Sequence, residues 1–196
     1  MTPRLLATAF AVSTIAAVPS FAEPELYTLD PSHSQILFSY NHLGFSTTYG
    51  MFSGFEGEIM FDAENPENSS VNVSMPVTMM FTGWEKRDAH FMSADFFNAS
   101  EDGRDLVTFT STAIEVTGDD TANITGDLTL NGVTLPVVLE TKLNQAAEHP
   151  MAKTPWIGFD ATTTLVRSEF NAGRAAPFVS DEVEVFISVE AQKAGT

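Results

Sequence analysis

Apolar and polar residues alternate with a period of two along most of this chain, and this pattern constrains the fold more than any other feature. Successive side chains of a β-strand point to opposite faces, so the alternation predicts strands that each bury one face. It is clearest between Val133 and Leu143. Comparable segments recur along the chain, at residues 36–42, 55–61, 71–79, 105–117, 124–130, 133–143, 157–165 and 183–189.

Turn-forming residues separate these segments. Asn131-Gly132 is a strong signal for a type I′ hairpin, because both residue types tolerate a positive φ. Only the stretch Trp84–Ala99 loses the alternation, and it predicts a short helix. We find no internal repeat, low-complexity tract or linker, so residues 23–196 are expected to form one domain.

Eight alternating strands predict an all-β protein, either a two-sheet sandwich or a closed antiparallel barrel. An eight-stranded barrel is just wide enough to be filled by side chains or to hold one slender ligand. Gly57 and Gly126 fall on inward faces. Small residues there would open a cavity, or they would mark a bulge or bend. The alternation leaves both choices open.

The first 22 residues have the pattern of an export signal. Arg4 provides a short positive region, residues 5–18 are apolar, and Ser20-Phe21-Ala22 predicts cleavage after Ala22. The alternative is a membrane anchor, but the apolar run is shorter than the roughly 20 residues that a span requires. We therefore expect an exported protein, located in the periplasm if the host is a Gram-negative bacterium.

Charge and cysteine content exclude several classes of function. The chain has 9 Lys+Arg against 26 Asp+Glu, a net charge of −17, which opposes binding to nucleic acid or to anionic lipid. It has no cysteine, which removes disulfides and thiolate chemistry. The histidines show no spacing typical of a metal site, so no metal is expected; they are His33, His42, His90 and His149.

A series of short motifs, in order, covers nearly the whole chain after residue 22. They are Tyr27-Thr28-Leu29-Asp30-Pro31-Ser32-His33-Ser34, His42-Leu43-Gly44-Phe45-Ser46, Gly50-Met51-Phe52-Ser53-Gly54-Phe55-Glu56-Gly57, Lys86-Arg87-Asp88-Ala89-His90-Phe91, Asp95-Phe96-Phe97, Gly126-Asp127-Leu128-Thr129-Leu130-Asn131-Gly132, and Arg167-Ser168-Glu169-Phe170. In this arrangement the chain resembles the YceI-like family of exported bacterial proteins. It departs from that family at Asn171, where Gly is usual, and at His90.

The resemblance implies a lipocalin-like, eight-stranded antiparallel barrel with an elongated apolar interior. It further implies binding of a polyisoprenoid or a related long-chain amphiphilic lipid, including quinone-like molecules. No other cofactor and no catalytic motif come with the resemblance. The residues agree with a non-enzymatic protein, since the neighbours His33 and Ser34 would point to opposite faces of a strand and no Gly-x-Ser-x-Gly elbow occurs.

Ten residues are candidates for contact with such a ligand. Five fall on predicted inward faces, namely Phe38, Tyr40, His42, Phe55 and Phe159; the others are Arg87, His90, Phe91, Phe97 and Arg167. Core packing is the simpler explanation for the inward Phe residues, whereas Phe91 and Phe97 would cap or gate an open barrel end. Arg87 would bind an oxyanion or pair with Asp88 or Asp95, and Arg167 would point inward or mark a strand end or bulge.

The leading hypothesis is therefore a periplasmic carrier that holds an isoprenoid-type lipid inside a barrel, with its head group near residues 84–97. The alternative is an interaction module with a filled barrel that docks a membrane redox protein or a stress-response partner. Stable membrane insertion and nucleic-acid binding are not expected. Pairing of two barrels through β-edges to give a homodimer is compatible with the pattern.

Overall fold

The computed structural model describes residues 23–195, so the predicted export signal lies outside the described part. The strands are β1 (Glu25–Leu29), β2 (Gln35–His42), β3 (Ser46–Ser53), β4 (Glu56–Phe61), β5 (Ser70–Pro76), β6 (Met80–Phe81), β7 (Leu106–Val116), β8 (Thr121–Leu130), β9 (Val133–Glu148), β10 (Pro155–Val166) and β11 (Glu182–Lys193). One α-helix, α1 (Glu85–Met92), falls where the alternation is lost. Three 3₁₀ turns are η1 (Pro66–Asn68), η2 (Val77–Met79) and η3 (Arg167–Phe170).

The sheet closes on itself. Neighbouring strands pair antiparallel in the order β1-β4-β5-β7-β8-β9-β10-β11, and β11 pairs back with β1. This ring confirms the predicted eight-stranded antiparallel barrel and excludes the sandwich. In residues 23–195, no helix has the length and apolar character needed to cross a bilayer.

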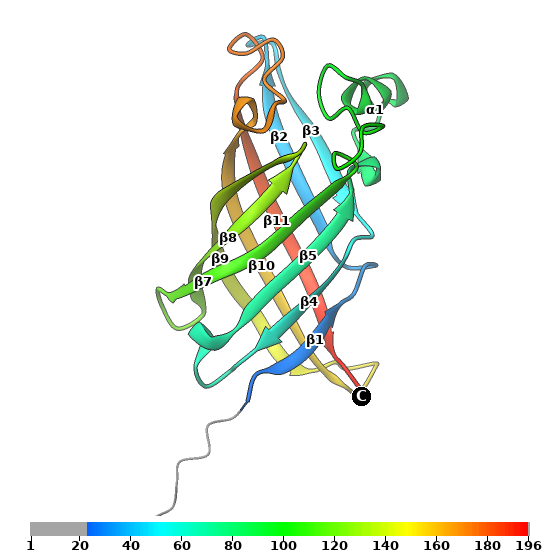
Figure 1. Cartoon of the computed structure of the whole chain (residues 1–196). Coiled ribbons are helices and arrows are strands. Elements are labelled where there is room, and N and C mark those ends of the chain that lie inside the picture. Colours follow the sequence, from blue (N-terminus) through cyan, green and yellow to red (C-terminus); the bar gives the residue numbers. More distant parts are fainter. Residues whose placement is uncertain (1–22, 196) are drawn as a thin grey trace, which may run out of the picture.

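The remaining strands lengthen the barrel at one end. The C-terminal end of β11 pairs with β1, and residues Glu184–Ser188 of β11 pair with β2. β1 and β2 therefore lie one after the other along the same side of β11. β3 continues the line of β4, and the short β6 continues β5 across η2. Figure 1 shows α1, the β2–β3 turn and the connection between β10 and β11 at this same end, opposite the C-terminus. We call this end the mouth, made of residues 41–46, 84–105, 131–132 and 167–181.

The fully buried core lies to one side of the barrel. It is built mainly by β1, β3, β4, β5, β10 and β11, with Phe55 and Ile157 each only 1% exposed. On β8 and β9 the inward side chains are only partly buried, although their alternation is regular. Dense packing on one side and looser packing on the other leave free volume along the barrel.

One predicted inward face ends earlier than expected. The alternation from Val71 predicts Met79 on the buried face, but β5 stops at Pro76 and Met79 is exposed. Proline has no N–H to continue the ladder, and the turn η2 that follows shifts the alternation. Met80, the next residue, is buried instead.

The inward glycines do not open the cavity. A Cβ on Gly126 would lie 2.4 Å from the ring of Phe109 and 2.7 Å from the carbonyl oxygen of Thr110. The β7–β8 register shifts beside Gly126, between Ser111 and Ala113, which is the bulge that the sequence left as an alternative. On Gly57 a Cβ would meet the Asn72 carbonyl oxygen at 2.8 Å. Both glycines allow neighbouring groups to approach the backbone.

This close packing predicts that Gly126→Ala destabilises the barrel. The new methyl group must displace Phe109 and strand backbone, so we expect the free energy of unfolding to fall by roughly 1–3 kcal/mol. Gly158→Ala is the matched control, because a Cβ there meets only the Val189 carbonyl oxygen at 3.8 Å. Urea unfolding measures both; equal stabilities for the two variants would contradict the packing argument.

Candidate functional site

A cavity of about 1060 Å³ runs through the barrel interior. At about 30 Å³ for each water-sized group, it has room for roughly 35 such groups, which suits a long chain. Apolar side chains dominate its walls along all the barrel strands, and the looser side provides Leu128, Leu130, Val137, Leu139 and Leu143. The cavity extends from the mouth to the β4–β5 and β7–β8 connections at the other end.

All ten predicted contact residues lie on the cavity lining. They are Phe38, Tyr40, His42, Phe55, Arg87, His90, Phe91, Phe97, Phe159 and Arg167. Some of them also pack in the core: Phe38 lies 5.8 Å from Phe52, and Phe159 lies 5.9 Å from Phe61, between ring centroids. Phe55 is almost fully buried, so packing accounts for most of its surface. Contact with a ligand stays a prediction for all ten.

Charge is distributed unevenly between the two ends of the cavity. The mouth contributes four basic side chains to the lining, and the opposite end contributes Asp119 and Asp120. Over all its residues the mouth has eight Asp and Glu, none of them on the cavity lining, and five Lys and Arg. The five basic residues are Lys86, Arg87, Arg104, Arg167 and Arg174. An amphiphile with a negative or electron-rich head group is therefore favoured with its head at the mouth.

Arg87 is held differently from either predicted pairing. Its Nε donates to the hydroxyl of Thr82 at 2.8 Å and its Nη2 donates to the Thr82 carbonyl oxygen. Asp88 accepts from the Thr82 N–H at 3.0 Å and from its hydroxyl. The predicted Arg87–Asp88 and Arg87–Asp95 pairs are thus wrong, because Thr82 lies between Arg87 and Asp88 and another arginine takes Asp95. The two bonds to Thr82 orient Arg87 at the cavity lining.

Arg167 lies at the end of β10, where η3 begins. Its guanidinium donates to four backbone carbonyl oxygens in the β10–β11 connection, those of Ala172, Arg174, Val179 and Ser180. Burial lowers the pKa of Arg167, and the nearby carboxylate of Asp181 opposes that shift. Since an arginine has five N–H donors, Arg167 chiefly organises this connection. Its position confirms the strand end that the sequence left as one of two choices.

The unusual Asn171 ends η3 in a left-handed conformation, with φ of 57°. Glycine is the commonest residue at such a helix end, and asparagine is the next best tolerated. The departure from the family pattern therefore leaves the local turn intact.

Two mouth segments are joined by an ion pair and an aromatic cluster. Asp95, from residues 84–105, pairs with Arg174 of the β10–β11 connection and lies 3.0 Å from Nε2 of His90. The ring of Phe96 meets those of His90 and Phe91 edge-on, at 5.1 and 5.0 Å between centroids. The α1 region is thereby fixed over the barrel end.

Asn131 is the central hydrogen-bonding residue of the mouth. It is fully buried, and its side-chain amide donates to the carbonyl oxygens of Phe96 and Phe170, both at 2.9 Å. Its side-chain oxygen accepts from Arg104 at 3.1 Å. The φ values of 52° and 75° at Asn131 and Gly132 confirm the predicted hairpin turn. The sequence signalled the turn alone; the partners lie 27 to 39 residues away and carry no local signal.

We expect Asn131→Gly to loosen the mouth while preserving the turn. Glycine accepts the positive φ but leaves the carbonyls of Phe96 and Phe170 without their donor, which costs roughly 1–3 kcal/mol. Hydrogen exchange should accelerate at residues 93–99 and 168–176, whereas β1, β4 and β5 keep their protection. Unchanged exchange in both mouth segments would show that Asn131 does not connect them.

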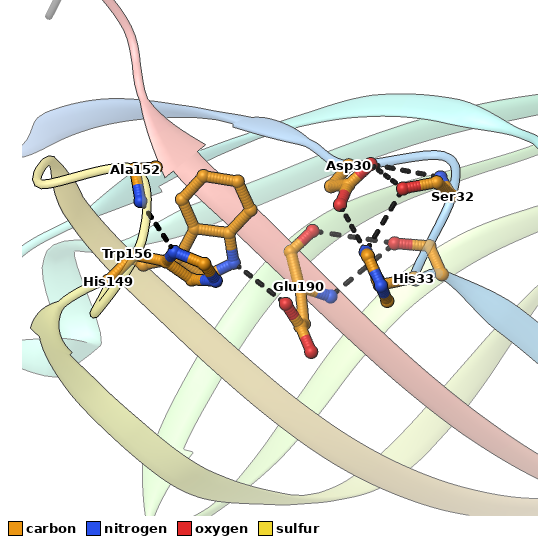
Figure 2. Close-up of polar contacts among 8 residues, drawn as sticks. Asp30, Ser32, His33, His149, Ala152, Trp156 and Glu190 are labelled. Atoms are coloured by element: carbon orange, nitrogen blue, oxygen red, sulfur yellow. Dashed lines mark hydrogen bonds and ion pairs between the residues drawn. The ribbon is translucent and has the colours of Figure 1, made fainter.

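A second polar cluster lies on the outer wall, where β1 ends and β2 begins (Figure 2). Nδ1 of His33 lies 2.6 Å from Asp30 and 3.0 Å from the Ser32 hydroxyl. Glu190 of β11 accepts from Nε1 of Trp156 at 3.0 Å, and its backbone bonds to the hydroxyl of Ser34. These contacts fix the break between β1 and β2 against β11.

The geometry of this cluster does not form a Ser-His-Asp relay. Ser32 and Asp30 both contact Nδ1 of His33, whereas a relay needs the serine on one ring nitrogen and the carboxylate on the other. Within residues 23–195, Asp30, His33 and Glu190 are the one group whose potential metal-ligand atoms converge, within 4.8 Å of one another. The sequence did not predict this convergence because Glu190 is far along the chain. The hydrogen bonds of Asp30, His33 and Glu190 described above explain why the three side chains lie together.

The Asp30–His33 pair predicts a pH dependence of stability. The hydrogen bond and charge of Asp30 raise the pKa of His33 above its ordinary 6.5. Burial disfavours the charged form of Asp30, but hydrogen bonds from His33 and Ser32 outweigh it and hold its pKa below 3.8. The stabilisation from His33 is thus complete below pH 6.5 and disappears as the pH rises through the raised pKa.

We expect His33→Gln to be less stable than the unaltered chain at pH 6, with the difference shrinking toward pH 9. Thermal unfolding across this range measures it, and Gln192→Ala on β11 is a control without a titrating group. A difference that is constant with pH would contradict the ion pair.

A closed antiparallel barrel around an elongated apolar cavity defines this molecule as a lipocalin-like β-barrel. The model of the YceI-like domain matches residues 27–191, and the chain belongs to the YceI-like family. It is 38% identical to the protein YceI of Escherichia coli O17:K52:H18 over 190 residues, 97% of each chain.

Solved structures share the fold. BcnA of Burkholderia cenocepacia superposes with a TM-score of 0.74 at 23% identity, over 83% of this chain and 98% of that one. A polyisoprenoid binding domain from Saccharophagus degradans, described as implicated in plant cell wall breakdown, gives a TM-score of 0.66 at 13% identity over 85% of this chain and 98% of that one. At these identities the likeness concerns the fold.

Proposed function

We propose that this protein binds and carries a polyisoprenoid or a similar long-chain amphiphilic lipid, which includes isoprenoid quinones. The apolar chain lies in the barrel, and the head group lies at the mouth near residues 84–97. The single observation that carries this proposal is the cavity of about 1060 Å³ with apolar walls and basic side chains at one end.

Burial of the lipid chain provides the binding free energy. Apolar surface transferred from water is worth about 25 cal/mol per Å², so a long chain gains from an apolar enclosure without specific hydrogen bonds. Basic groups at the mouth then select the orientation. Arg87 and Lys86 offer donors to a phosphate or carbonyl oxygen, whereas Asp119 and Asp120 disfavour such a head group at the other end.

The comparisons support this class of ligand. The Saccharophagus degradans domain that shares the fold is named for polyisoprenoid binding, and the chain belongs to the same kind of barrel family. We propose no catalytic step, so the lipid would be sequestered and released unchanged. The leader pattern in residues 1–22 supports a periplasmic location.

A second candidate function is an interaction module for a membrane redox or stress-response protein. A row of outward apolar side chains favours it: Phe186, Leu37, Met51 and Phe81 are neighbours across β11, β2, β3 and β6. The same row would serve a homodimer. The interaction-module hypothesis assumed a barrel filled by side chains, whereas the barrel has an open cavity. Lipid binding is therefore the stronger proposal.

Native mass spectrometry of the protein purified from its own host tests the proposal. We expect one lipid per chain, with solvent extraction yielding an isoprenoid or another long-chain species. An unliganded mass, with no uptake of isoprenoids offered in excess in detergent, would overturn lipid binding and leave the interaction module in first place.

Filling the cavity should block the lipid without disturbing the outer surface. Thr163 lines the cavity on β10, whereas its neighbour Thr164 is exposed on the outer wall. Thr163→Trp should reduce lipid occupancy at least tenfold, because an indole takes the space of several chain carbons. Thr164→Trp is the matched control and should keep full occupancy. Equal occupancy in the two variants would place the ligand outside the barrel.

A further inference from the structure

Three large apolar side chains stand out from the mouth on three separate connections. Phe45 in the β2–β3 turn is 89% exposed, Phe178 in the β10–β11 connection is 76% exposed, and Trp84 before α1 is 58% exposed. The connections that carry Phe45 and Phe178 are adjacent, because His42 forms a β-bridge with Val179 and the Ser180 N–H donates to the Asn41 carbonyl oxygen at 2.9 Å.

The three connections that carry these side chains all contribute residues to the cavity lining. Trp84 itself lines the cavity, and so do Ser46 and Val179, the chain neighbours of Phe45 and Phe178. The α1 region is fixed beside β2 by the contact of Phe91 with Tyr40, 6.2 Å between ring centroids. Trp84 therefore connects the apolar interior with the exposed surface, and Phe45 and Phe178 stand next to lining residues in the chain. Figure 1 shows the three connections at one end of the barrel.

A single exposed apolar side chain on a protein surface is ordinary. Three around one opening are not required by the fold, since each lies in a connection and none fills the core. Exposed apolar groups gathered at a binding site mark a surface that meets another apolar phase. Their positions on different connections suit a fluid surface, which can surround each side chain without a preformed pocket.

We propose that the mouth docks on the surface of a zwitterionic phospholipid bilayer, with Phe45, Trp84 and Phe178 inserted at the level of the head groups. This inference rests on the proposed function, because it names the place where the lipid enters and leaves the cavity. A chain that moves from bilayer to barrel through such a contact exposes little apolar surface to water.

The charge distribution fits this orientation. Lys86 and Arg87 lie two and three residues after Trp84, with Glu85 between, so two basic groups lie in the first turn of α1 close to an inserted indole, where they meet lipid phosphates. The mouth has eight Asp and Glu beside its five Lys and Arg, and the net charge of −17 opposes contact of any face of the barrel with an anionic membrane. Charge therefore favours a bilayer without net charge, and the exposed aromatic side chains direct the contact to the mouth.

The chain contains 2 Trp residues, one next to α1 and one paired with Gln192 near the C-terminal end of β11. Trp84 is at the mouth, whereas Trp156 is at the start of β10 and bonds to Glu190. In Trp156→Phe, Trp84 is the remaining fluorophore; in Trp84→Phe, it is Trp156. With vesicles of brominated phosphatidylcholine, we expect strong quenching and a blue shift of Trp84 emission and no change for Trp156. Equal quenching of both, or quenching of neither, would overturn the proposal.

A double variant tests the transfer of lipid. The protein carrying both Phe45→Ser and Phe178→Ser should take up an isoprenoid alcohol from phosphatidylcholine vesicles at least tenfold more slowly. The amount of the alcohol that it binds from detergent micelles should stay the same. Met151→Ser is the matched control, because Met151 is 84% exposed at the opposite end of the barrel. This variant should take up the isoprenoid alcohol at the rate of the unaltered protein. Equal transfer rates for the rim variant and the control would contradict docking through the mouth.

These measurements separate the two proposals. Vesicle quenching of Trp84 needs no cargo, so it reports docking alone. Uptake from micelles without quenching would refute docking and retain lipid binding. Quenching without any uptake would refute lipid binding and retain the bilayer contact.

Discussion

The pairing of β11 with β1 is the constraint on which the rest of the structure depends. It closes a ring of eight strands, so every strand gains a neighbour on both sides and each acquires an inner and an outer face. β11 pairs with β10 along its length and with β1 and β2 in succession. The Asp30 N–H donates to the Glu190 carbonyl oxygen at 2.8 Å, which maintains the contact between β11 and the β1–β2 break. Without this closure the inward apolar faces would not enclose a volume.

An enclosed volume becomes a binding site only if the interior is not filled. Here the large buried side chains gather on one side, and the inward residues of β8 and β9 remain partly exposed to the cavity. The side chains of the mouth give a bound amphiphile a preferred orientation. Asn131 joins the two long connections by hydrogen bonds, Arg167 organises one of them, and Arg87 is oriented by Thr82. A hydrogen-bonded opening that adds basic and aromatic side chains to the lining of an apolar interior is suited to an amphiphile held in one orientation.

Local patterns predicted the elements well because period-two alternation reports which side of a strand is buried. Each predicted segment contains a strand, and the helix in residues 84–99 and the turn at Asn131-Gly132 agree with the structure. The prediction missed β1 (Glu25–Leu29), which completes the ring, and the strands β3 (Ser46–Ser53) and β6 (Met80–Phe81). The alternation failed at Met79, where Pro76 and a 3₁₀ turn shift the face that points inward. It also gave no reason to pair Arg87 with Thr82, because the choice among nearby partners depends on how α1 enters from β6.

The sequence by itself determined an all-β chain, a set of inward residues and, through its motifs, membership of a family of barrels. Strand parity explains why Phe38, Tyr40, His42 and Phe159 line the cavity. Arg87, His90, Phe91, Phe97 and Arg167 lie outside the strands, and they line it because their connections stand at the barrel end. Only the tertiary structure decided that the interior is open, that basic groups gather at one end and that Asn131 joins the mouth. These features depend on side chains that the fold brings together from distant parts of the chain. A local alternation of apolar and polar residues carries no information about the distance between such side chains.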